Sequence, residues 1–209
     1  MGAILLPDCT LFPHGALPLH IFEDRYRQML SEALEGDCLF CVGRLTSEET
    51  PEYHDCTAEI GTAGLIRTSR EQPDGRSDLI LHGVCRVRFT EWLPGKAYPF
   101  SRIEPVPSLP LREKDATTES RRLRNAVESV LLGFPDKIVK QVEALLDRAT
   151  EPTIMSDVVA QQFVQDSELR HSLLGEPDVS KRSDLIGEDL RFLRYGGSWT
   201  AHGLTEAHS

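Results

Sequence analysis

Basic residues are scarce in this chain of 209 residues, with 23 Lys and Arg against 33 Asp and Glu and a net charge of −10. Proteins that bind DNA or RNA use clustered Lys and Arg to neutralise phosphates. Both halves of the chain, divided at Pro110, are acidic, and the densest basic run, residues 121–124, is interpreted as a solvated helix face. The charge therefore excludes nucleic acid as the expected partner.

Long apolar runs are also missing. None approaches the roughly 20 residues that span a bilayer, and the first residues lack the basic start of a secretory signal. The five cysteines are an odd number in a chain long enough to fold without disulfides. These features exclude a membrane partner and predict a cytoplasmic protein.

The common catalytic motifs are absent as well. The sequence has no Gly-rich phosphate loop, no G-x-S-x-G and no H-E-x-x-H. Cys38 and Cys41 have the spacing of a zinc or redox pair, and His54, Cys56 and Cys85 are the candidates for further zinc ligands. On a strand, however, that spacing points the two thiols to opposite faces, which favours buried core thiols. We therefore predict no catalytic residue, no metal and no cofactor.

Short strand-like segments fill the first half of the chain. Apolar residues alternate over residues 16–21, and helical spacing follows from Phe22 until Gly36. A Pro-Asp-Gly turn lies within residues 72–75. The remaining predicted strands are residues 38–45, 59–68, 79–92 and 98–106. Strands separated by such turns are typical of a small barrel or sandwich.

In the second half of the chain, the spacing of the apolar residues changes from a period of 2, typical of strands, to a period of 3.6, typical of helices. Pro105, Pro107 and Pro110 mark the boundary, and five amphipathic helices are predicted beyond it, the last of which is stopped by Gly196. Helices of this size must bury their apolar stripes against one another or against the strands. We predict a β-subdomain at 1–110, a helical subdomain at 111–195 and a disordered tail at 196–209.

Trp92, Tyr98 and Phe100 flank a Pro-Gly turn and are predicted to meet across a hairpin. One interpretation is an apolar patch that captures an exposed peptide. The alternative, packing between the strands and the helices, is the commoner use of such rings. The peptide patch therefore stands as a hypothesis for the binding site.

Three segments together resemble the N-terminal, substrate-binding domain of the Lon proteases. Residues 11–29, LFPHGALPLHIFEDRYRQM, are similar to its opening motif, with His14 as an addition before the glycine. Residues 61–66, 73–76 and 83–89, GTAGLI, PDGR and GVCRVRF, resemble its next series, and residues 173–182 match more loosely. Together the matches span nearly the whole chain, and their order and spacing make the resemblance specific.

The resemblance implies an α+β fold, in which a PUA-like β-barrel with one internal helix is followed by an α-helical bundle. It implies a role in recognising proteins, without the ATPase and protease modules that follow this domain in Lon proteases. Arg25, Tyr26, Gly83 and Arg86 belong to the matching motifs and are expected to serve the fold. Arg86 is predicted to pair with a carboxylate such as Glu23.

The predicted function is that of a non-enzymatic module that binds exposed apolar segments of client proteins. Its substrate-binding residues would be Trp92, Tyr98 and Phe100. Its partners would be unfolded or degron-bearing proteins, together with a separate protease. The alternative is a small-molecule-binding regulatory domain on a PUA-like barrel, and an enzyme that depends on the cysteines is a third hypothesis.

Overall fold

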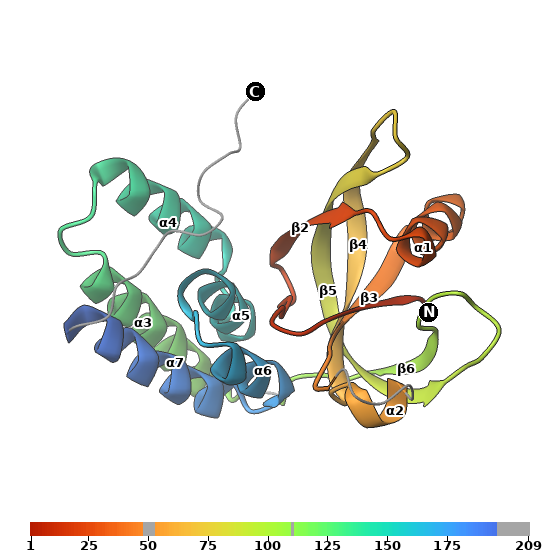
Figure 1. The fold of residues 1–209 in the computed structure, drawn as a ribbon. Coiled ribbons are helices and arrows are strands. Elements are labelled where there is room, and N and C mark those ends of the chain that lie inside the picture. Colours follow the sequence, from red (N-terminus) through yellow and green to blue (C-terminus); the bar gives the residue numbers. More distant parts are fainter. Residues whose placement is uncertain (48–52, 110, 196–209) are drawn as a thin grey trace. The chain divides into compact units, whose positions relative to one another are not determined.

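The chain divides into two compact units, Met1–Pro107 and Ser108–Ser209, in a computed structural model that describes residues 1–47, 53–109 and 111–195 (Figure 1). The sequence predicts a boundary after residue 110, and the contacts place it after Pro107, within the same proline-rich stretch. The predicted tail, residues 196–209, lies outside the described residues.

The first unit is a mixed sheet with helices inserted between its strands. Its elements are β1 (Ala3–Leu6), β2 (Ala16–Ile21), α1 (Asp24–Glu35), β3 (Leu39–Arg44), α2 (Tyr53–Cys56), β4 (Ile60–Glu71), β5 (Ser77–Trp92) and β6 (Ser101–Pro105). The strand order is β1-β3-β4-β5-β2, with β6 also paired to β5. The β1–β3 pair is parallel and the other pairs are antiparallel.

The sheet is not closed, so the PUA-like barrel predicted from the sequence is not confirmed. The long strand β5 pairs with β2 through its first half, Ser77 to His82, and with β6 through its second half, Val87 to Trp92. Two strands therefore share one edge of β5, and β2 ends the strand order. β1 approaches the start of β6 through one isolated bridge, Gly2 with Phe100, rather than through a ladder.

The strands alternate between two core clusters, because successive residues of a strand point to opposite faces. In β3, Phe40 and Val42 join the cluster beneath α1, whereas Cys41 joins the other. The helix α1 lies beside β3 (Figure 1), and its buried residues Tyr26, Met29, Leu30 and Ala33 have the predicted helical spacing. It ends at Gly36, as predicted.

The second unit consists of helices where the sequence predicts them. They are α3 (Glu113–Val130), α4 (Asp136–Arg148), α5 (Pro152–Phe163), α6 (Ser167–Gly175) and α7 (Val179–Tyr195). α5 contacts α3, α4, α6 and α7, and its continuous run of residues 155–160 is buried. None of the helices in the described ranges is long and apolar enough to cross a membrane. The α+β class is confirmed.

Candidate functional site

The three aromatic residues of the predicted peptide patch do not form one cluster. Trp92 packs on Phe89, with ring centroids 5.0 Å apart, and on Tyr53 at 5.5 Å. Tyr98 and Phe100 form an edge-to-face pair at 6.3 Å in the cluster beneath α1. The strand pairing explains the separation, because Trp92 pairs with Ser101 and the residues next to Ser101 point to the opposite face. The prediction of a single patch is therefore wrong.

Tyr98 and Phe100 instead line a pocket of about 430 Å³ beside α1. The Tyr98 side chain is almost entirely buried, whereas Phe100 is half-buried. The other lining residues are Met1, Gly2, Met29, Glu32, Ala33, Asp37, Leu39 and Lys96. The pocket thus combines an apolar wall with the Lys96 ammonium, the N-terminal ammonium of Met1 and two carboxylates.

Glu32 is the polar centre of this pocket. One of its carboxylate oxygens, Oε2, accepts from Lys96 Nζ at 2.5 Å and from the Tyr98 hydroxyl at 2.7 Å. Its other oxygen accepts from Gln28 Nε2 at 2.9 Å. These hydrogen bonds lower the pKa of Glu32 to about 2, and the bond from Lys96 has the largest effect. The Lys96 ammonium also lies 5.8 Å from the centroid of the Tyr98 ring and 6.0 Å from that of Phe100, within cation–π range.

A second surface of interest is the outer face of the sheet where β5 lies between β2 and β4. Every second residue of β5 from Asp78 to Val84 points outward there, and Ile80 and Val84 keep 44% and 47% of their surface exposed. Ile80 pairs with the exposed Pro18 on β2 and with Thr68 on β4. A shallow hollow of about 460 Å³ lies over Pro18, Thr68 and Ile80, and its wall also includes His20, Arg70 and Asp78.

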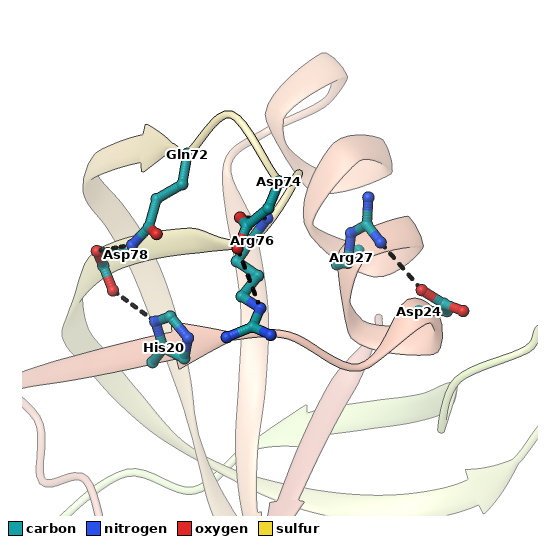
Figure 2. A network of polar contacts seen from close by, with 7 residues as sticks. All are labelled: His20, Asp24, Arg27, Gln72, Asp74, Arg76 and Asp78. Atoms are coloured by element: carbon teal, nitrogen blue, oxygen red, sulfur yellow. Dashed lines mark hydrogen bonds and ion pairs between the residues drawn. The ribbon is translucent and has the colours of Figure 1, made fainter.

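Polar side chains border the apolar row at the hairpin end of the sheet. Figure 2 shows His20 Nδ1 and Gln72 Nε2 on the two oxygens of Asp78, each at 2.7 Å. Both hydrogen bonds lower the pKa of Asp78, and the bond with His20 has the larger effect. The adjoining β4–β5 turn forms as predicted, with Gly75 at a φ of 79° and its N–H donating to Gln72 O at 2.9 Å. Phe22, which is 60% exposed, stacks beside His20.

Gly83 explains why two of the sequence motifs occur together. A Cβ at this position would lie 2.1 Å from the carbonyl oxygen of Phe12. The segment before β2 is bonded directly to Gly83, since His14 N donates to Gly83 O at 2.8 Å and Gly83 N donates to Gly15 O at 2.9 Å. The opening motif therefore lies on β5 at a position that only glycine permits.

Of the other motif residues, Tyr26 and Arg86 are buried, whereas Arg25 is exposed. Tyr26 is 4% exposed and its hydroxyl accepts from Leu5 N at 3.4 Å. Burial raises the pKa of Tyr26. Arg25 lies over the Tyr26 ring at 4.6 Å and donates to Glu23 at 2.8 Å, so the carboxylate predicted for Arg86 is held by Arg25. Arg86 is 4% exposed, which leaves little of it accessible to a client.

The cysteines are buried or half-buried in the first unit. Cys41 is fully buried in β3, and burial raises the pKa of its thiol to about 12. Cys38, Cys56 and Cys85 are half-buried or buried free thiols. Within the described ranges, no three His, Cys, Asp or Glu side chains come together as metal ligands would.

Comparison with known proteins identifies the family. The substrate-binding domain of the ATP-dependent protease La (LON) matches residues 2–191. The chain belongs to this family. It is 26% identical to Lon protease 2 of Sorangium cellulosum over 90% of this chain and 24% of that protein, and 24% identical to the Lon protease of Koribacter versatilis over 89% of this chain and 23% of that protein. This LON-domain chain thus spans about a quarter of the length of these relatives.

Solved structures show the same fold. The N-terminal domain of Mycobacterium avium complex Lon protease matches with a TM-score of 0.72 and 14% identity, over 91% of this chain and 97% of that one. The Lon N-terminal domain protein from Xanthomonas campestris matches with a TM-score of 0.62 and 19% identity, over 89% of this chain and 95% of that one. Both matches extend over the two units of the LON-domain chain.

Proposed function

We propose that this chain is a non-enzymatic protein-binding module that holds exposed apolar segments of client polypeptides on the outer face of β2 and β5. Membership of the LON substrate-binding family supports recognition of proteins as its role. The observation that carries the choice of surface is the apolar row of Pro18 and Ile80, which are paired across β2 and β5, together with the exposed Val84 and Phe22 of the same two segments. Large exposed apolar side chains gathered on one face are typical of interaction sites.

The position of β2 supports backbone pairing with a client segment. β2 ends the strand order, and β5 is its ladder partner. Bonded and non-bonded pairs alternate along an antiparallel ladder, and Gly83 N bonds to Gly15 O just before β2. The backbone groups of Ala16, Pro18 and His20 are therefore directed away from β5. An extended client strand could pair with the carbonyls of these residues while its side chains contact Ile80 and Pro18.

Binding of this kind is expected to be weak and reversible. The hollow is shallow and Pro18 offers no N–H, which reduces the number of backbone bonds available to a client strand. Such a module would hold a client long enough to present it to a separate protease, which we propose as its second partner. No covalent step is needed for this role.

The test is titration of a fluorescently labelled, permanently unfolded polypeptide rich in apolar segments into the full chain. We expect saturable binding that Ile80→Asp weakens about tenfold, because a charge replaces the central apolar contact. Leu34→Asp is the matched control, since Leu34 on α1 is 45% exposed and lies away from the apolar row. Absence of saturable binding would contradict the proposal, as would an equal loss in both variants.

A further inference from the structure

We propose that the pocket beside α1 binds a Lys or Arg side chain of the client, and that the chain's own Lys96 occupies this site when no client is present. The inference rests on the proposed function, because it names a second feature of the client, a basic residue. It uses Tyr98 and Phe100, two of the residues predicted from the sequence. Trp92 has no part in it, because it lies in the other cluster.

The pocket has the components of a cation site. Glu32 supplies a carboxylate, and the rings of Tyr98 and Phe100 lie 5.8 and 6.0 Å from the ammonium that now occupies the site. Asp37 is a second carboxylate on the wall of the same pocket, where it also interacts with the N-terminal ammonium of Met1. A carboxylate together with aromatic faces is the combination that holds alkylammonium and guanidinium groups.

Tyr98 and Gln28 keep the carboxylate in place independently of Lys96. The Tyr98 hydroxyl donates to the same Glu32 oxygen that accepts from Lys96, and Gln28 donates to the other oxygen. Tyr98 is itself fixed in the core, at 4% exposure. The carboxylate therefore stays directed at the pocket if Lys96 leaves, which is what exchange of one cation for another requires.

Lys96 is well suited to leave the site. Its side chain and that of Glu32 are 37% and 36% exposed, and ion pairs with that much solvent contact contribute little net stability. Lys96 follows the Pro94–Gly95 turn, and Gly95 has a φ of +96° with open space around it. A Cβ at Gly95 would meet no atom within 4 Å, so this side of the turn is open, and the weak, exposed ion pair lets a client cation replace Lys96 at small cost.

The test compares two peptides of the same apolar sequence, one with a central Arg and one with Gln in its place. With the full chain, Lys96→Ala should tighten binding of the Arg peptide about two- to fivefold, because the competing ammonium is gone. Glu32→Gln, which keeps an acceptor for Tyr98 but removes the charge, should abolish the preference for Arg over Gln. Lys181→Ala, which removes another exposed lysine that pairs with Glu176, is the matched control.

The outcomes separate this inference from the proposed function. If both peptides bind equally and Lys96→Ala changes neither affinity, the cation site is wrong while the apolar binding face stands. If neither peptide binds, the proposed function itself fails. A gain for the Arg peptide alone in Lys96→Ala, lost again in the double variant with Glu32→Gln, supports the site.

Discussion

Each of the two units contains a close ion pair, but the two pairs have opposite surroundings. In the first unit, Lys96 and Glu32 lie 2.5 Å apart, and each side chain is more than a third exposed. In the second unit, Arg182 on α7 and Asp157 on α5 lie 2.8 Å apart, and each is 1% exposed. The exposed pair can open into solvent at little cost, whereas the buried pair cannot open without leaving a charge in the core.

The buried pair is also tied into the helical unit by further bonds. Arg182 donates to the hydroxyl of Ser108 at 3.0 Å, which attaches the first residue of the unit to α7. Asp178, from the same loosely matched motif, accepts from the N–H of Ser180 at 2.9 Å at the start of α7. This motif therefore serves the packing of the helices, and we assign client contact to the first unit.

The largest expected effect follows from breaking the buried pair. Asp157→Ala leaves the Arg182 charge in the core and should lower the free energy of unfolding of the helical unit by about 3–5 kcal/mol. Urea unfolding followed by far-UV circular dichroism measures it. Asp147→Ala, which removes the exposed partner of Arg124, should cost less than about 1 kcal/mol. Equal losses in the two variants would show that burial does not distinguish these pairs.

Replacing both buried charges sharpens the same comparison. In the double variant Asp157→Leu with Arg182→Met, no uncompensated charge remains, so most of the stability lost in Asp157→Ala should return. The measurement is again the urea midpoint. A double variant as unstable as Asp157→Ala would mean that hydrogen bonds of the pair, rather than charge burial, hold α5 and α7 together.

The smallest expected effect belongs to the exposed pair and appears as a dependence on pH. The pKa of Glu32 is lowered to about 2 in the folded chain, from an ordinary value of 4.5. Its stabilising effect is therefore complete above pH 4.5 and is lost as the pH falls towards 2. The difference in urea midpoint between the native chain and Glu32→Gln should be constant above that range and shrink below it. A difference that grows on acidification would contradict this assignment.

The local sequence pattern predicts most helices, strands and turns. The features that it does not predict arise from pairing between strands that are distant in the sequence. The spacing of Tyr26, Met29 and Leu30 predicted α1, and the Pro-Asp-Gly sequence predicted the turn at Gly75. The open sheet could not be predicted, because it results from two strands sharing β5. The separation of Trp92 from Tyr98 likewise depends on the pairing register of β5 and β6, in which Trp92 lies opposite Ser101. That register includes a shift between Phe89 and Glu91, which is not visible in the sequence.

The site was only partly predictable for the same reason. Tyr98 and Phe100 were found from their aromatic character, but their partner Glu32 lies more than sixty residues earlier in the chain. Nothing in the spacing of Glu32 distinguishes it from the other acidic residues of α1. The apolar row of Pro18 and Ile80 was missed because each residue is unremarkable alone, and only the β2–β5 pairing brings them together.

The most direct test of client binding by the first unit is hydrogen–deuterium exchange of the full chain with and without the permanently unfolded polypeptide. We expect slower exchange in β2 and β5 when the polypeptide is bound, with α3 to α7 unchanged. Slower exchange confined to the helices of the second unit, with β2 and β5 unaffected, would contradict it.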